Sequence, residues 1–201
     1  MDLKGKVIGY GLTGSHCTLA QTFEPMEALV QLGAEVIPVI SSSVQSVQTR
    51  FGNPEKWQET IFALTGHKPL TSIAEVEPFG PQKLVDAMVV APCTGTTMAR
   101  LANAISDTAV LMGTKATMRN GRPVVLAVAT NDALGLNAKN LGVLMAVRHV
   151  YFVPFGQDNP YVKPTSIEAD FSYIVPTLLA AMAGKQYQPM LVPRYTQEGS
   201  H

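Results

Sequence analysis

The sequence predicts an α/β fold with a doubly wound, mostly parallel β-sheet. Short apolar runs at 35–40, 87–91 and 123–128 are typical of strands that are buried on both faces of such a sheet. Segments with apolar residues at helical spacing alternate with these runs along the chain. Small polar turns follow the strands, and open α/β sheets bind ligands at that edge.

The length of 201 residues suits one domain with a substantial core. We assign residues 1–195 to this domain and treat 196–201 as a disordered tail or an expression remnant. Hydrophobic residues make up 46% of the chain and charged residues only 15%. This low charge favours burial of surface between subunits, so we expect a homo-oligomer.

Several classes of protein are excluded by composition. Fifteen basic and fifteen acidic residues cancel, and no basic run points to a nucleic-acid partner. No apolar stretch reaches the roughly 18 residues of a membrane span, and no signal peptide precedes the first strand. Two cysteines are too few for a disulfide scaffold, and four scattered histidines offer no metal site. We therefore expect a cytoplasmic protein with reduced thiols and no metal.

The chain opens with a predicted strand at 6–10, a turn containing Gly11 and Gly14, and a helix over 19–32. Together with Gly9, these glycines have the spacing of a dinucleotide-binding fingerprint. Gly9 lies within the strand, so a dinucleotide site is only one alternative. The second strand, 35–40, is not followed by the acidic residue that would bind a ribose, which favours a mononucleotide.

Ser41, Ser42 and Ser43 follow the second strand and form either an ordinary loop or a hydroxyl cluster beside a phosphate. Further along, apolar residues predict a short helix over 57–64, ended by Gly66, and then an edge strand at 70–72. We interpret His67, in the intervening turn, as a solvated loop residue rather than a catalytic one.

The stretch from Asp86 to Asp107 is the centre of the predicted site. A buried strand at 87–91 stops at Pro92, and the turn at 93–97 leads into a helix whose first turn hydroxyl groups can cap. Such a turn is either an ordinary connection or an anion site at a helix N-terminus. Cys93 is a candidate nucleophile or a small residue that fits a crowded turn.

The remaining elements continue the alternation, with one or two helices over 101–118, strands at 123–128 and 150–153, and helices over 136–145 and 167–183. Five turns should then meet at one edge of the sheet: 11–15, 41–43, 93–97, 129–132 and 156–158. Both thiols, Cys17 and Cys93, are expected near the same edge.

The predicted ligand-binding residues are small and mostly hydroxyl-bearing: Gly14, Ser15, Ser41, Ser43, Thr94, Gly95, Thr96 and Thr97. They suit an anion such as a phosphate or a carboxylate. No Ser-His-Asp arrangement or carboxylate pair stands out for catalysis, so a bound cofactor would have to supply the chemistry.

These motifs resemble the flavoprotein family of flavin-containing cysteine decarboxylases, phosphopantothenoylcysteine decarboxylase and the flavin prenyltransferase. The turn at 11–15 is similar to the family's flavin-phosphate turn, and 91–97 resembles its Ala-Pro-x-Ser/Thr-Ala-Asn-Thr turn. The segment 101–107 resembles its Ala-Asn-Gly-x-x-Asp segment, and the resemblance covers nearly all of 5–155. It implies a Rossmann- or flavodoxin-like three-layer sandwich, bound FMN and a trimer-based assembly.

The chain also departs from the family pattern. The catalytic histidine of the decarboxylases would fall near Pro78, and no histidine lies between His67 and His149. The substrate turn Ala-Pro-Ala-Met-Asn is replaced by 127–131, which keeps only Asn131 as a further catalytic candidate. The asparagine of the 91–97 turn is replaced by Thr96. The catalytic residue therefore stays unknown, and the decarboxylase activity is in question.

One branch of the family is most similar in sequence, at the opening residues 4–18, the turn 91–97 and the segment 154–160. The resemblance implies a subunit that makes dipicolinic acid from a dihydrodipicolinate-type precursor during sporulation. It also implies an A subunit that carries the NADP-binding site. Three alternatives remain: a subunit of such an oxidoreductase, a stand-alone flavin decarboxylase or prenyl-transfer enzyme, and a plain FMN-binding module.

Overall fold

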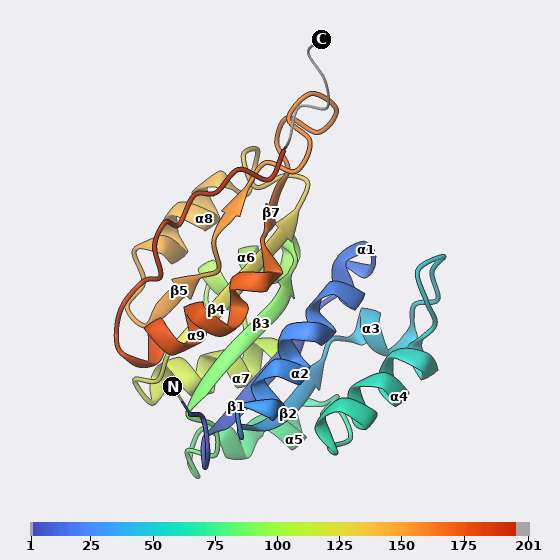
Figure 1. Ribbon diagram of the computed structural model, residues 1–201, viewed down its shortest axis with the longest axis vertical. Coiled ribbons are helices and arrows are strands. Elements are labelled where there is room, and N and C mark those ends of the chain that lie inside the picture. The colour runs from blue at the N-terminus through green and yellow to red at the C-terminus, as the bar shows by residue number, and fades with distance from the viewer. Residues whose placement is uncertain (1, 196–201) are drawn as a thin grey trace.

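A seven-stranded sheet lies at the centre of the computed structural model, which describes residues 2–195 (Figure 1). Its strands are β1 (Val7–Leu12), β2 (Glu35–Ile40), β3 (Ala87–Cys93), β4 (Val124–Thr130), β5 (Val150–Phe152), β6 (Phe155–Gly156) and β7 (Ile167–Ala169). The order along the sheet is β2-β1-β3-β4-β7-β6, with β5 also paired to β4. Strands β1 to β5 pair in parallel, whereas β7 is antiparallel to β4 and β6. The predicted fold class is confirmed.

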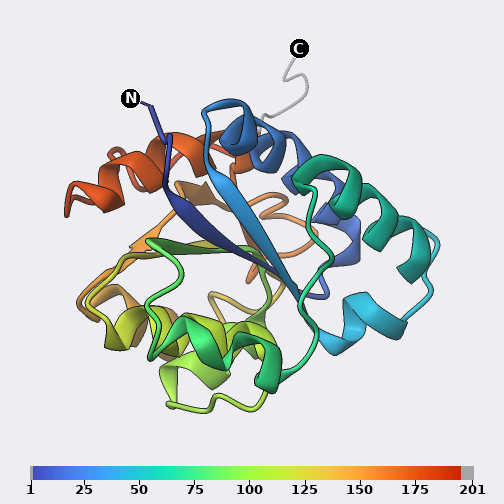
Figure 2. The same cartoon turned by 90° about the horizontal axis from the view of Figure 1, so that it is seen from below.

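Helices cover both faces of the sheet. They are α1 (His16–Leu19), α2 (Phe23–Gln31), α3 (Ser42–Ser46), α4 (Pro54–Thr65), α5 (Ile73–Val76), α6 (Gly95–Ala102), α7 (Ala109–Arg119), α8 (Ala138–Met145) and α9 (Ile174–Met182), with short 3-10 turns at 20–22, 77–79 and 171–173. Figure 2 shows α2 and α9 on one side of the sheet and α5, α6 and α7 on the other. The described part of the chain holds no helix long and apolar enough to cross a membrane.

The core centres on β3, all of whose residues are buried, and on its neighbours β1 and β4. The continuous apolar runs fit this position, because both faces of these strands are covered. Gly9 in β1 packs against Met88, and a Cβ at Gly9 would lie 2.6 Å from the Met88 Sδ atom. Gly9, which has the spacing of a dinucleotide-binding glycine, therefore allows β1 to pack closely against Met88.

The predicted boundaries are mostly close to the observed ones. The strand at 35–40 is β2, and the helix that ends at Gly66 is α4, whose C-cap is Gly66 with a φ of 72°. Residues 101–118 fall in two helices, α6 and α7. The helix predicted over 19–32 begins earlier, as α1, and reaches α2 through a 3-10 turn. The predicted tail, 196–201, lies outside the described residues.

Three local predictions are wrong. Pro92 does not end its strand, since β3 continues to Cys93 across a shift of register, where the missing N–H of proline is tolerated. Residues 70–72 form only an isolated bridge from Leu70 to Val39, because Ser72 begins α5 with a capping box to Glu75. The predicted last helix starts at Ile174, since 167–169 pairs with β4 and β6 as β7.

Candidate functional site

A cavity of about 890 Å³ lies at the carboxyl ends of the parallel strands. Residues from four of the five predicted turns line it: 13–15, 41–43, 94–97 and 129–132. Asp158, from the fifth turn, also lines the cavity, as do Ile167 and Glu168 of β7. The predicted convergence of these turns is therefore present in the structure.

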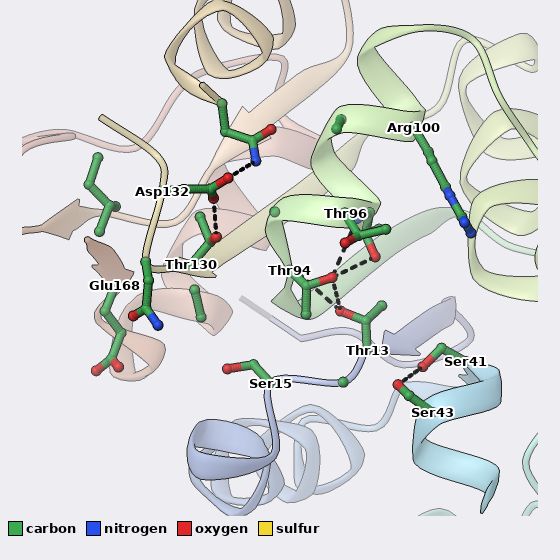
Figure 3. A pocket seen from close by; sticks show the side chains of 18 of the residues that line it. Thr13, Ser15, Ser41, Ser43, Thr94, Thr96, Arg100, Thr130, Asp132 and Glu168 are labelled. Carbon is green, nitrogen blue, oxygen red and sulfur yellow. Dashed lines mark hydrogen bonds between the residues drawn. The ribbon is translucent and has the colours of Figure 1, made fainter. Parts of the chain in front are cut away.

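The cavity floor is a junction between the turns after β1 and β3 (Figure 3). Thr13 is buried, and its hydroxyl donates to the Pro92 carbonyl at 2.7 Å and accepts from the Thr94 N–H at 3.1 Å. Thr94 caps α6, where its Oγ1 accepts from the Thr97 N–H at 3.3 Å and lies 2.9 Å from the Thr97 hydroxyl. These bonds hold the two turns in a fixed relation.

Beside this junction lies the hydroxyl half of the cavity, which we define as Gly14, Ser15, Ser41, Ser43 and the α6 turn 94–97. The Ser41 and Ser43 hydroxyls are 3.1 Å apart, and Ser15 Oγ accepts from Thr18 at 2.9 Å. A Cβ at Gly14 would collide with the Ser43 hydroxyl, so glycine permits this close approach. Each predicted ligand-binding residue lines the cavity on this side, around the start of α6.

The opposite side is the acidic half, which we define as Thr130, Asn131, Asp132, Asp158 and Glu168. Asp132 Oδ1 accepts from the Thr130 hydroxyl at 2.6 Å, and Asp132 Oδ2 accepts from Asn137 Nδ2 at 2.7 Å (Figure 3). This carboxylate lies against the first residue of α6, since a Cβ at Gly95 would be 2.8 Å from Asp132 Oδ1. A phosphate would be repelled from this side, so the hydroxyl half is the better anion site.

The two other carboxylates of the acidic half are paired with cations. Asp158 lies 3.5 Å from Lys163 Nζ, and Glu168 lies 2.8 Å from Arg194. Burial raises the pKa of Asp158, but hydrogen bonds from Ser166 and from its own backbone N–H, together with Lys163, lower the pKa by more, so it lies below its usual value. Arg100, on the outer side of α6, also lines the cavity and pairs with Asp107 at 3.4 Å.

The two catalytic candidates differ in position. Asn131 lines the cavity, and its Oδ1 accepts from the Ser166 hydroxyl at 3.4 Å. Cys93 is fully buried, and burial raises the pKa of its thiol to about 12, so the expectation of a thiol facing the ligand edge is wrong for Cys93. We assign Cys93 to packing.

A thiol-labelling experiment checks this contrast. Cys17 is exposed and lines the cavity, whereas Cys93 is in the core. We expect a thiol reagent to label Cys17 rapidly and Cys93 only on unfolding, and Cys17→Ser to remove the rapid phase. FMN should slow the labelling of Cys17. Rapid labelling of Cys17→Ser at Cys93 would contradict the placement.

Sequence reasoning missed the polar side chains behind the acidic half, Asn137 and Asn140. Both are more than nine-tenths buried, and Asn140 Nδ2 donates to Asn137 Oδ1 at 2.8 Å. The sequence offers only their spacing as a signal, since Asn137 and Asn140 lie three residues apart and so on one face of a helix. Among the described residues there is no group of histidines, cysteines and carboxylates that could hold a metal ion.

The fold and this cavity define a doubly wound α/β protein with a ligand cavity at the sheet edge, and the chain belongs to the Flavoprotein family, whose profile matches residues 1–175. It is 51% identical over 194 residues to the B subunit of dipicolinate synthase from Bacillus subtilis (strain 168), covering 96% of this chain and 97% of that protein. The crystal structure of the dipicolinate synthase B subunit from Bacillus halodurans C has a TM-score of 0.90 and 48% identity, over 97% and 100% of the two chains.

A more distant structure shows the fold alone. The dodecameric FMN-dependent UbiX-like decarboxylase from Escherichia coli O157:H7 has a TM-score of 0.59 and 18% identity, over 74% of this chain and 79% of that one. The family assignment suggested by the sequence motifs is thus confirmed, and the chain is similar over nearly its whole length to the B subunit of dipicolinate synthase.

Proposed function

We propose that the chain is the flavin-binding B subunit of a dipicolinate synthase, an oxidoreductase that forms dipicolinic acid from a dihydrodipicolinate-type precursor. The observation that carries this proposal is the 51% identity to such a protein across 96% of the chain. The cavity at the ligand edge of the sheet supports it, because its hydroxyl half offers hydrogen-bond donors to an anion.

FMN is the cofactor that the hydroxyl half fits. A phosphate beside Gly14 would find the hydroxyls of Ser15, Ser41 and Ser43 on adjacent turns, and each such hydrogen bond contributes about 0.5–1.5 kcal/mol. No described residue accepts a hydrogen bond from the N–H of Thr96 in the first turn of α6, and Thr96 is exposed, so this N–H can meet a ligand. FMN, when bound, supplies two-electron redox chemistry.

A second chain is expected to hold the nicotinamide cofactor. Ser41 follows β2 at the position where a dinucleotide site would carry an acidic residue, and Gly9 serves packing. We therefore assign the NADP site to an A subunit, as the naming of the relatives as B subunits suggests. We place the two-subunit enzyme in the cytoplasm of a sporulating bacterial mother cell.

Reconstitution with the A subunit tests this function. The purified chain, FMN, the partner and NADP are mixed with the dihydro precursor, and dipicolinate is measured by its ultraviolet absorbance. We expect product only when both chains are present. Decarboxylation or prenyl transfer by this chain alone would support the stand-alone enzyme. FMN binding with no effect on the partner's rate would support a simple FMN-binding module.

We also expect the chain to self-associate, in a trimer-based assembly. Large apolar side chains are exposed around the cavity rim and α8, with Leu136 at 86% and Val162 at 74% exposure. A distant relative of the same fold is dodecameric. Sedimentation at micromolar concentration should give a multiple of three chains, and a monomer under these conditions would contradict the expectation.

A further inference from the structure

We propose that Asp132 is the catalytic base of the cavity, which accepts the proton released when the dihydropyridine dicarboxylate is oxidised to the aromatic ring. The inference rests on the proposed function for its substrate. Among the described titratable groups that line the cavity, Asp132 differs in that it has no ion pair and is held by a chain of amide hydrogen bonds.

The cavity lining offers few groups that could accept a proton. The titratable side chains among the described lining residues are Cys17, Arg100, Asp132, Asp158 and Glu168. Asp158 pairs with Lys163, and Glu168 shares Arg194 with Asp170, whereas no described cation lies within ion-pair distance of Asp132. Among the described carboxylates that line this cavity, Asp132 is therefore the one without an ion pair.

A directed chain of amides holds Asp132 in place. Asn103 Nδ2 donates to Asn140 Oδ1 at 3.3 Å, Asn140 donates to Asn137 at 2.8 Å, and Asn137 donates to Asp132 Oδ2 at 2.7 Å. Every donor in the chain points toward the carboxylate. Because Asn137 and Asn140 are buried, the amide orientations are fixed by one another, and Asp132 is presented in a single orientation.

Each Asp132 oxygen keeps a free lone pair. Oδ1 accepts one bond from Thr130 and Oδ2 accepts one from Asn137, while a carboxylate oxygen can accept two. The side chain is half-buried and borders the cavity opposite Ser15 (Figure 3). A substrate whose carboxylates lie toward the hydroxyl half, away from the like charges of the acidic half, would present a ring C–H bond to this oriented proton acceptor.

The chemistry requires such a group. Aromatisation of a dihydropyridine breaks two bonds to hydrogen. One hydrogen leaves with its electron pair as hydride, and the oxidant of the proposed enzyme, FMN with NADP of the A subunit as final acceptor, would take up that pair. The other leaves as a proton and forms an O–H bond on Asp132, whose carboxylate becomes a neutral acid. Proton loss from Asp132 to water then restores the carboxylate for the next turnover.

Asp132→Asn is a suitable test because the hydrogen-bond network can survive it. The new amide oxygen can accept from Asn137 Nδ2, and the new NH₂ can donate to the Thr130 hydroxyl, which accepts as readily as it donates. Charge and basicity are lost while the shape is retained. Glu27→Gln is the matched control, since it removes the same charge from the exposed face of α2.

The first test measures proton uptake and needs no turnover. Dipicolinate, the aromatic product, is titrated calorimetrically into the FMN-loaded protein in two buffers of different ionisation enthalpy at pH 7.5, roughly physiological pH. A bound dianion disfavours a second negative charge beside it, so wild type and Glu27→Gln should take up protons on binding, and a wild-type uptake of zero would overturn the assignment. Asp132→Asn should take up none, and its affinity should not fall as pH rises.

The second test measures rate with the A subunit present. Asp132→Asn should lower turnover by at least about 100-fold, because the amide cannot accept the proton, whereas Glu27→Gln should leave it unchanged. FMN affinity should stay within about twofold of wild type, since the phosphate side is unchanged.

Proton uptake that persists in Asp132→Asn, or that is lost in Asp158→Asn with Asp132 intact, would overturn the assignment. So would a variant turnover within about threefold of wild type. A wild-type pair that forms no dipicolinate would reject the proposed function, and the uptake experiment would still decide whether Asp132 is the proton-accepting group of a dicarboxylate site.

Discussion

Replacing Ser15 by leucine should abolish FMN binding, with at least about a 100-fold loss of affinity, equivalent to about 2.7 kcal/mol. Ser15 lines the hydroxyl half of the cavity, and its side chain is half-buried in the turn after β1. Leucine removes the hydroxyl and fills the space that the phosphate would occupy, so both the hydrogen bond and the access are lost.

Ser15→Ala separates these two effects. It removes only the hydroxyl, so we expect a loss of about 0.5–1.5 kcal/mol, a few-fold to tenfold in affinity. FMN and dipicolinate are titrated separately into wild type and both variants at moderate salt. Unchanged FMN affinity in Ser15→Leu would exclude this cavity as the flavin site. If wild type binds dipicolinate and not FMN, the family fold stands without the flavin.

The second large effect is expected for Gly95→Ala at the start of α6. The added Cβ would lie 2.5 Å from Thr130 Oγ1, 2.8 Å from Asp132 Oδ1 and 2.9 Å from Asn137 Nδ2. Because these three groups hydrogen-bond to one another, they cannot all move away without breaking a bond. We expect a loss of about 1–3 kcal/mol in unfolding free energy, measured by denaturant titration.

Gly142→Ala is the control for helix propensity. Gly142 lies inside α8, and no heavy atom lies within 4 Å of the added Cβ. Alanine there should raise the unfolding free energy by about 0.5–1 kcal/mol, because glycine is a poor helix residue. A Gly95→Ala variant as stable as wild type would show that the acidic half is not packed against α6 as described.

Local sequence signals were sufficient for most of the sheet. Glu35–Ile40 is bounded by Gly33 and by serines, and Thr94 carries the hydroxyl that caps α6, so both boundaries follow from neighbouring residues. The β7 strand could not be predicted in this way. Ile167–Ala169 is too short to show a period, and it is defined by distant partners in β4 and β6.

The candidate site shows the same division. The proximity of the turns after β1, β2, β3 and β4 could be predicted from topology alone, since parallel strands end at one edge of the sheet. The separation into a hydroxyl half and an acidic half could not, because it depends on which way Asp132 points. Likewise, Cys93 is adjacent to the turn in sequence, but its side chain is fully buried in the core.

The visible absorption spectrum of FMN titrated into the purified chain, alone and with the A subunit, tests the central claim most directly. A flavin held in this cavity should show shifted visible bands and quenched fluorescence, saturating at about one FMN per chain. Ser15→Leu should leave both signals at their free-flavin values. A spectrum that stays identical to free FMN in wild type, with and without the partner at about 1 mM flavin, would contradict the claim that this cavity binds flavin.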